Sequence, residues 1–447
     1  MRRRGAWLRI RPTDLKAAVV RIVYDTHSTR QKDMTTAPVP GGRRQAALIF
    51  IVITILIDFL GIGLIIPVLP EIVADLTRGT TYSPDLTYGV LAGVYALMQF
   101  LFAPLIGALS DHIGRRPVLL ASILGLGIDY LLIAWAPTLG WLFLGRVIAG
   151  ITAANVTAAN AYIADITPPE DRVKSFGLIG AAFGIGFILG PALGGLLGEA
   201  HPRLPFLVAA GLATLNFLYG YFILPESLPP ERRTPRMRWR FNPFVAIAGL
   251  RRYPAVLALA FTILCINLAD QALRSTWVLY TGARFGWGPL DNGLSLTAVG
   301  VFAAIVQGGL IGRIARRLGE VRTFMLGVGA GVVSMTLYGF TTQGWMMYSI
   351  MAIGALSGVA LPSAQAIVTG QVDPQEQGAV QGALASLASI SAIVAPPLAT
   401  YLFSTYSQPE RTPYIPGIAF FFGAALLLIG LLFGIRQIAR PPATQSG

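Results

Sequence analysis

Two aspartates and one arginine each interrupt a long apolar run. Asp58, Asp129 and Arg146 lie among Leu, Ile, Gly, Ala and aromatic residues. An ionised side chain in an apolar medium is costly, so a carboxyl placed there is protonated, paired or turned toward water. Such a carboxyl can take up a proton from one compartment and release it to another. The alternatives are a carboxyl that only joins helices by a hydrogen bond and, for Arg146, a side chain that extends to the membrane interface.

A second set of polar residues lies in other apolar runs. Asp270 and Arg274 are four residues apart with the acid first, which is the favourable order for an ion pair on a helix. We expect a structural or gating pair, with a second proton site as the alternative. The residues that we expect to line a substrate cavity are Tyr95, Gln99, Asn155 and Thr157. Hydrogen bonds between helices are the simpler role for each of them.

The composition places these residues in a membrane protein. Of 447 residues, 54% are hydrophobic and 12% are charged, against about a quarter charged in a soluble domain. A soluble globular protein is therefore excluded. About 20 apolar residues of helix cross the hydrocarbon core. We expect an all-α integral membrane protein with twelve transmembrane helices, near residues 46–69, 88–109, 117–136, 141–164, 175–198, 204–224, 254–280, 293–312, 321–340, 345–369, 377–402 and 417–436.

The basic residues predict the orientation of these spans. With both termini on one side, twenty-eight Lys and Arg lie in the tails and loops of that side and four lie in the loops of the other. The positive-inside rule then predicts cytoplasmic termini and an inner-membrane location. The net charge of +13 reports orientation and contact with anionic lipid, so a nucleic-acid partner is not expected.

An internal repeat divides the spans into two halves. At an offset of 205 residues, glycine or proline recurs at positions 107 and 312, 114 and 319, 169 and 374, 177 and 382, and 191 and 396. Parallel six-helix halves that enclose a substrate site are a known transporter plan. We expect a basic tail at 1–45, halves at 46–224 and 254–436, a cytoplasmic connection at 225–253 and a tail at 437–447. The chain starts at Met1 or at Met34.

The loop after the second span combines charged residues with glycines, namely Gly107, Asp111, Gly114, Arg115 and Arg116. Asp111 is expected to cap the start of the third span, where the helix dipole is positive. The arginines can hold anionic lipid. The loop is either a topological anchor or a latch that forms when the cavity faces outward and breaks when it faces inward.

The fifth span carries a proline among small residues at helical spacing, namely Gly186, Gly190, Pro191, Gly194 and Gly195. Small residues one turn apart allow close approach to a neighbouring backbone, and the proline removes one helical hydrogen bond. Ordinary helix packing explains these glycines as well as a functional bend does.

These strings resemble a known family. GALSDHIGRRP after the second span resembles the signature of the major facilitator superfamily, and GFILGPALGG resembles the motif of its drug/proton antiporter branch. LIDFLGIGLIIPVLP, YALMQFLFAP, SILGLGIDYLLIA and STWVLYTGARFGW are similar to the tetracycline-resistance efflux pumps. The resemblance implies the major facilitator fold, export of an amphipathic drug in exchange for protons, and coupling roles for Asp58, Asp129 and Arg146.

The resemblance fails at two titratable positions. The tetracycline pumps carry a histidine in span eight and an aspartate in span nine, where this sequence has Ala303 and Gly331. Coupling would then rest on the first half. The three histidines lie in tails or loops, and there is one cysteine, Cys265. We therefore expect no metal site and no cofactor, and we expect the protein not to be an enzyme. A monomer is expected, and a major facilitator importer of a small metabolite is the alternative function.

Overall fold

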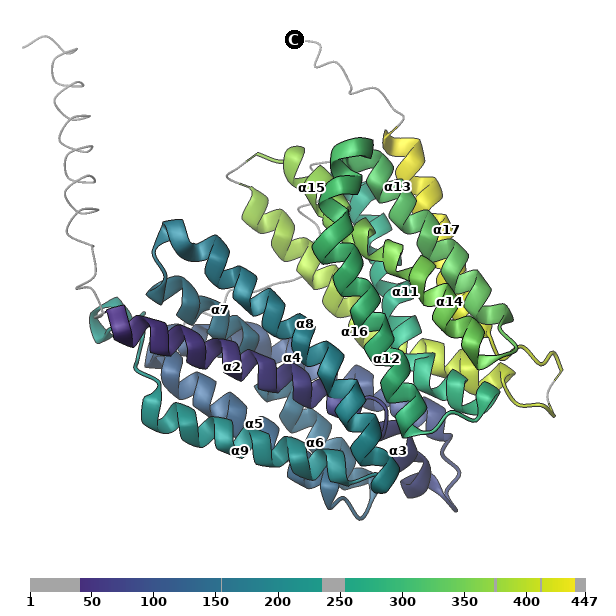
Figure 1. Ribbon diagram of the computed structural model, residues 1–447, viewed down its shortest axis with the longest axis horizontal. Helices are drawn as coiled ribbons and strands as arrows, with labels where there is room; N and C mark the ends of the chain where they lie inside the picture. The colour runs from purple at the N-terminus through teal and green to yellow at the C-terminus, as the bar shows by residue number, and fades with distance from the viewer. Residues whose placement is uncertain (1–40, 154, 235–253, 374–375, 411, 439–447) are drawn as a thin grey trace, which may run out of the picture.

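The computed structural model describes residues 41–153, 155–234, 254–373, 376–410 and 412–438. Within these ranges the chain is helical and contains no strand (Figure 1). Met34, most of the basic tail and most of the connection at 225–253 lie outside them. The helices are α2 (Gly41–Ile65), α3 (Leu69–Thr77), α4 (Pro84–Ile113), α5 (Arg115–Ala134), α6 (Leu139–Thr152), α7 (Asn155–Ile166), α8 (Arg172–Ala200), α9 (Leu204–Ile223), α11 (Pro254–Phe285), α12 (Pro289–Ala304), α13 (Ile311–Phe340), α14 (Gly344–Ala355), α15 (Ala360–Gly370), α16 (Gln377–Tyr406) and α17 (Ile418–Ile438).

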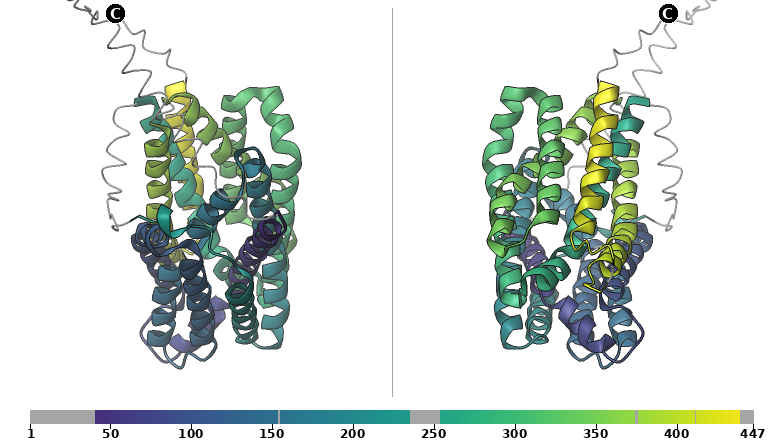
Figure 2. Two further views of the ribbon diagram at one scale, coloured as in Figure 1. Left: turned by 90° about the vertical axis from the view of Figure 1, so that its left-hand side faces the viewer. Right: turned by 90° about the vertical axis from the view of Figure 1, so that its right-hand side faces the viewer.

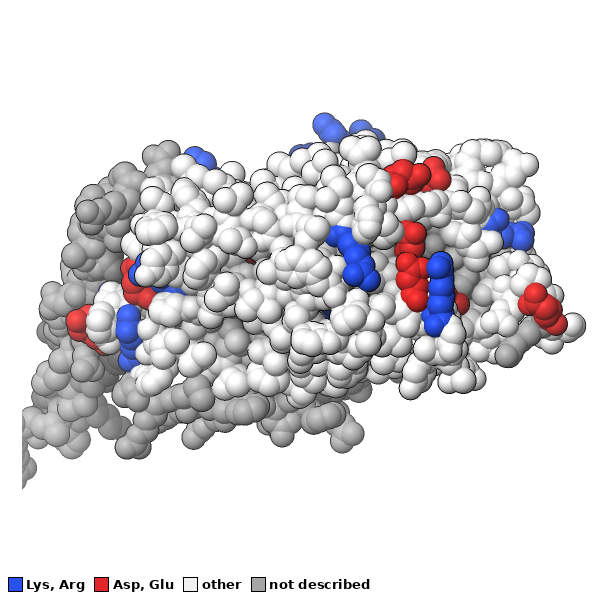
Figure 3. Space-filling view, turned by 90° about the horizontal axis from the view of Figure 1, so that it is seen from below, with Lys and Arg blue, Asp and Glu red and all other residues white. Residues whose placement is uncertain are grey.

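The twelve expected spans are confirmed. Eleven described helical stretches are long and apolar enough to cross a membrane, and one of them, Pro289–Phe340, has 52 residues. This stretch bends at Gly319, whose φ of 74° is left-handed, so it forms spans eight and nine. The protein is therefore a multi-pass membrane protein. Its surface agrees, because apolar side chains such as Phe222 and Phe340 are 77% and 69% exposed, and the face in Figure 3 shows charged residues at only a few positions.

The repeat found in the sequence recurs in the backbone. Gly114 and Gly319 have φ values of 114° and 74°, and each joins two helices at the same point of its half. Adding 205 to the first residues of α6 and α8 gives the first residues of α14 and α16. The two halves form separate groups of helices in Figure 2. A positive φ suits glycine because it has no Cβ, which explains why these positions keep glycine in both halves.

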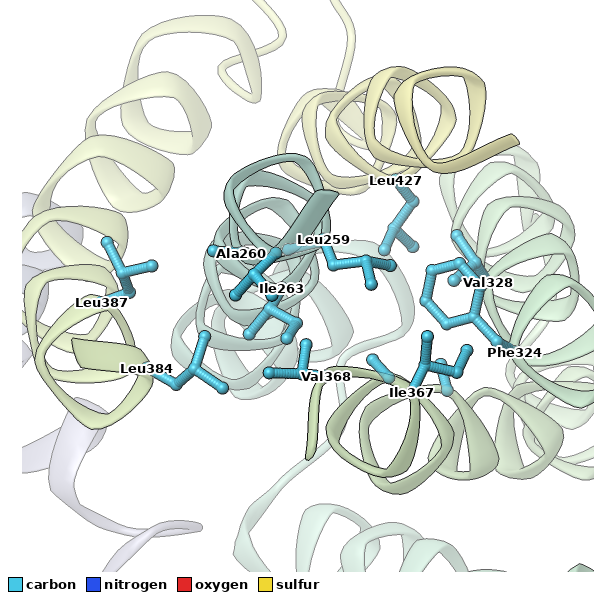
Figure 4. Close-up of a cluster of buried hydrophobic side chains, with 14 of the residues drawn as sticks. Leu259, Ala260, Ile263, Phe324, Val328, Ile367, Val368, Leu384, Leu387 and Leu427 are labelled. Atoms are coloured by element: carbon cyan, nitrogen blue, oxygen red, sulfur yellow. The ribbon is translucent and has the colours of Figure 1, made fainter. Parts of the chain in front are cut away.

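Each half has its own apolar core. In the second half, α11, α13, α15, α16 and α17 enclose side chains that include Leu259, Phe324, Val368 and Leu427 (Figure 4). In the first half, two clusters are built mainly from α2, α4, α5, α6, α7 and α9. Separate cores allow each half to move as a unit.

The halves pack together at one end of the molecule. The end that holds Gly114, where α4 meets α5, is called the motif end, and the opposite end is called the far end. Near the far end, a Cβ added to Gly195 would lie 2.6 Å from the Pro289 carbonyl oxygen, and one added to Gly89 would lie 2.7 Å from that of Pro396. These are backbone contacts of α8 with α12 and of α4 with α16.

The same helices lie apart toward the motif end. Added Cβ atoms at Gly177 and Gly180 of α8, or at Gly378 and Gly382 of α16, would meet nothing within 4 Å in the described structure. The ribbons of the two halves diverge in this direction in Figure 1. Among the described residues, the halves therefore pack together at the far end and lie apart at the motif end.

Candidate functional site

Asp129 and Arg146 form a buried ion pair inside the first half. Nη2 of Arg146, on α6, donates a hydrogen bond to Oδ2 of Asp129, on α5. The two side chains are 11% and 1% exposed. The guanidinium thus turns into the protein instead of extending to an interface.

The carboxylate of this pair is only partly satisfied. Among the described residues, Oδ1 of Asp129 and Nε of Arg146 have no hydrogen-bond partner. Oδ1 would lie 2.7 Å from a Cβ added to Gly145, so the absence of a side chain at that position lets the carboxylate fit against α6. A buried carboxylate with an unsatisfied oxygen is costly, which makes its protonation state sensitive to its surroundings.

Tyr95 of α4 packs beside the Asp129–Arg146 pair. The guanidinium carbon of Arg146 lies 5.8 Å from the centroid of the Tyr95 ring, within cation–π range. Tyr95 also interacts electrostatically with Asp58 and Asp129. Of the expected cavity residues, Tyr95 is therefore the one that the structure brings to the charged pair.

Asp58 approaches the same cluster from α2. Its side chain is buried, with 9% of the residue exposed. One turn further along α2, a Cβ added to Gly61 would lie 2.7 Å from the Tyr130 hydroxyl oxygen, and Tyr130 interacts electrostatically with both Asp58 and Asp129. Tyr130, which no local sequence pattern indicated, is thus close enough to both expected coupling carboxylates to feel their charges.

The other expected cavity residues lie elsewhere or are not described. Gln99 is half-buried on α4, one turn from Tyr95. Thr157 of α7 approaches Gly107 at the motif end, with its methyl carbon 4.0 Å from the position of an added Cβ. The side chain of Asn155 lies outside the described side chains. The structure therefore groups only part of the expected set.

The expected loop after the second span is helical on both sides of Gly114, and ion pairs within the first half hold this junction. Nη1 of Arg115 bonds to Oδ1 of Asp111, and its Nε donates to Oδ2 of Asp165, on α7, at 3.2 Å. Arg116 donates through Nη2 to the Tyr221 carbonyl oxygen at 2.6 Å. Asp111 and the two arginines thus join α4, α5, α7 and α9 at this end.

The expected cap at the start of the third span was wrong. Asp111 pairs with Arg115 instead, and the carboxylate of Glu226 accepts hydrogen bonds from the backbone N–H groups of Arg115 at 2.9 Å and Arg116 at 3.3 Å. A Cβ added to Gly114 would lie 2.3 Å from Oε2 of Glu226. Glu226 follows the sixth span, 111 residues after Arg115, so no local pattern at the third span could have identified it.

The glycines of the fifth span are contact residues. Cβ atoms added to Gly186, Gly190 and Gly194 would lie 2.9, 2.8 and 2.3 Å from backbone atoms of α2. Gly195 and the Pro191 carbonyl instead face Gly293 of α12. The motif thus packs α8 against α2 within the first half and against α12 of the second.

Asp270 and Arg274 are paired, as expected. Nε of Arg274 donates to Oδ2 of Asp270 at 2.7 Å, and the side chains are 55% and 47% exposed in the order Arg274, Asp270. The guanidinium carbon lies 5.7 Å from the centroid of Phe187, on α8. The pair therefore faces the other half across the space between them.

The position of the missing span-nine acid is filled. A Cβ added to Gly331 would lie 2.9 Å from a Leu427 methyl carbon, so a longer side chain there would require the Leu427 side chain to move. In the described part of the chain, no three His, Cys, Asp or Glu residues are grouped as metal ligands would be.

Two bundles of six membrane-spanning helices, with charged side chains buried in one bundle and facing it from the other, define a transporter architecture. The family model described as Major Facilitator Superfamily matches residues 51–353 and 310–447. The chain belongs to the major facilitator superfamily, and it is a secondary transporter.

Relatives of known activity match most of the chain. The tetracycline resistance protein of class C from Escherichia coli is 42% identical over 385 residues, which cover 86% of this chain and 95% of that protein. The class B protein from Escherichia coli is 37% identical over 395 residues, with 88% and 96% covered. The expected resemblance to this group is confirmed.

Solved structures share the fold. The human organic anion transporter MFSD10 is 24% identical, with a TM-score of 0.64 and 87% of this chain and 99% of that chain covered. The nucleoside transporter NupG is 13% identical, with a TM-score of 0.71 and 88% and 100% covered. The expected major facilitator fold is confirmed.

Proposed function

We propose that the protein exports an amphipathic, tetracycline-like molecule across the inner membrane in exchange for protons. The observation that carries the proposal is the burial of Asp58, Asp129 and Arg146 within one half, where Arg146 pairs with Asp129. A carboxyl with access to water from one side at a time can exchange its proton between compartments. The similarity to tetracycline resistance proteins supports a drug as the exchanged molecule.

The proposed orientation places the motif end in the cytoplasm, because that end carries the basic loops. The structure then represents the state that is open to the inside and closed to the outside. The ion pairs around Asp111 and Arg115 remain within the first half in this state, in agreement with a latch between halves that is broken when the molecule faces inward.

The inward movement of one proton per exported molecule supplies enough energy for export. A charge that moves inward gains about 2.3 kcal/mol per 100 mV, and about 1.4 kcal/mol corresponds to a tenfold concentration ratio. The first-half carboxyls can therefore drive accumulation without titratable groups at Ala303 and Gly331.

Vesicles that contain the purified protein and a pH-sensitive dye test this proposal. With an acidic interior, addition of tetracycline or another exported drug should release protons from the vesicle, whereas empty liposomes should not respond. Proton movement together with the solute, in the same direction, would instead indicate a symporter and overturn the proposal.

A further inference from the structure

A small group of side chains between the halves remains without a role in the proposed coupling. Asp270 and Arg274 lie on α11, and Phe187 lies opposite them on α8. Within the part of the chain that the structure describes, Asp270 is the only hydrogen-bond partner of Arg274. The remaining N–H groups of the guanidinium and the second carboxylate oxygen are thus available to a ligand.

The position of this group is central. Phe187 is thirteen residues from the end of α8 at Ala200, and Arg274 is eleven residues from the end of α11 at Phe285. At 1.5 Å per residue, both lie about 16–20 Å from the far end, near the middle of a bilayer. The backbone contact between Gly195 and α12 lies beyond them toward the far end. The group therefore lies on the motif-end side of the backbone contact between the halves.

Aromatic rings extend the group along α8 and α2. The rings of Phe183 and Phe187 are nearly parallel, with an interplanar angle of 11° and centroids 6.0 Å apart. The Phe59 ring meets Phe183 edge to face at 4.4 Å. Phe183 is 46% exposed. An exposed aromatic surface beside a charged pair suits a ligand with an aromatic body and a polar end.

The backbone adds one more acceptor. Pro191 has no N–H group, so the carbonyl of Phe187, four residues earlier, lacks its usual helical hydrogen bond. The carbonyl of the next residue, Ile188, accepts a hydrogen bond from the Thr297 hydroxyl of α12 at 3.0 Å. The missing helical donor therefore falls at the residue whose ring faces Arg274.

The charges favour a ligand that carries both signs. A cationic ligand beside Asp270 would be repelled by Arg274, and an anionic ligand beside Arg274 would be repelled by Asp270. A ligand with both an ammonium and an oxyanion compensates both side chains. A guanidinium also suits an oxyanion because it offers several N–H donors in one plane.

We propose that Asp270, Arg274, Phe183 and Phe187 form a binding subsite for an aromatic zwitterion, with the ligand's ammonium at Asp270 and its oxyanion at Arg274. This inference rests on the proposed function, because it assigns the space between the halves to the exported molecule. It gives the second half a direct part in recognition.

Two fluorescent probes that differ by one carboxylate test the subsite. Nε-dansyl-lysine carries an ammonium and a carboxylate, and dansylcadaverine is the same molecule without the carboxylate. The purified full-length protein in detergent should bind dansyl-lysine more tightly. In the double variant D270N/R274Q, dansyl-lysine should bind about tenfold more weakly or worse, the size of a lost charge-assisted hydrogen bond. Dansylcadaverine should change little.

Controls separate the subsite from folding and from transport. Retained monodispersity and an unchanged Tm would show that the double variant folds, and Phe187→Leu should weaken both probes. The proposal would be overturned by equal binding of dansyl-lysine to wild type and to the folded double variant, or by no saturable binding to wild type. Drug-induced proton release that persists in wild-type vesicles would leave the proposed function standing in either case.

Discussion

Arg146 of α6 donates a hydrogen bond to the carboxylate of Asp129 on α5, and both side chains are buried within the first half. The pair explains how two charges are accommodated in a membrane-embedded bundle. It also makes each residue dependent on the other, because removal of one partner leaves an uncompensated charge.

Arg146→Ala should therefore destabilise the protein by about 3–5 kcal/mol. The double variant Asp129→Asn/Arg146→Gln should lose less, since neither charge is left alone. Thermal unfolding in detergent, followed by tryptophan fluorescence, measures both effects. Additive losses from the corresponding single variants would show that the two side chains do not interact.

Glu226→Ala should remove the cap from α5. The backbone N–H groups of Arg115 and Arg116 would lose their acceptor, at a cost of about 1–2 kcal/mol. Those of Ser227 and Leu228, which donate to the same carboxylate, would lose theirs as well. Ser227→Ala is the matched control, because it removes only a hydroxyl that donates to Asp165 at 3.2 Å. A lower Tm for the glutamate variant and a near-normal Tm for the serine variant are expected; equal values would refute the capping role.

Gly195→Val should shift the molecule toward closure at the motif end, because the new side chain pushes α8 from Pro289 at the far end. Gly177→Ala on the same helix is the control, since nothing lies within 4 Å of its added Cβ. Spin labels at Leu178 and Leu310, in a background that lacks Cys265, report the distance between the halves. An unchanged distance distribution in the valine variant would contradict the packing described at the far end.

Glu71 of α3 predicts a pH-dependent effect on stability. Partial burial of this largely exposed residue raises the pKa of its carboxyl, and the nearby carboxylates of Asp75 and Glu199 raise it further, against the opposing effect of Arg78. The folded protein thus favours the protonated form, so the charged form lowers stability at neutral pH and this cost disappears as the pH falls. Glu71→Gln should raise the Tm by about one degree at pH 8.

The gain from Glu71→Gln should shrink toward pH 4, where the wild-type carboxyl is protonated as well. Glu170→Gln, at an exposed position, serves as the control and should show no such trend. A gain that is constant across this pH range would mean that the glutamine acts through packing.

The sequence predicted features that depend on composition and spacing, and missed those that depend on distant contacts. The twelve spans and the 205-residue repeat follow from hydropathy and from paired glycines such as Gly114 and Gly319. The Asp270–Arg274 pair follows from helical spacing. Glu226 could not be assigned to α5, because its partners lie far away in the chain. Tyr130 was missed because a tyrosine beside Asp129 has no distinctive local pattern.

The arrangement of the halves was also beyond the sequence. Glycines at 177 and 195 share one helix, yet only the second meets a backbone from the other half. Their difference arises from how the two halves lie relative to each other, which composition does not encode. The contact between Arg274 and Phe187 also depends on how the halves lie relative to each other, because Phe187 belongs to the other half.

Transport by the Asp58→Asn variant tests the coupling role most directly. The control is Asp75→Asn, which removes a carboxylate from the exposed ion pair with Arg78 at the far end. In vesicles with an imposed proton gradient, the Asp58 variant should lose drug-induced proton release and uphill accumulation, but should still exchange labelled for unlabelled drug without a gradient. Asp75→Asn should behave as wild type. Proton-driven accumulation at the wild-type rate in the Asp58 variant would contradict a coupling role for this carboxyl.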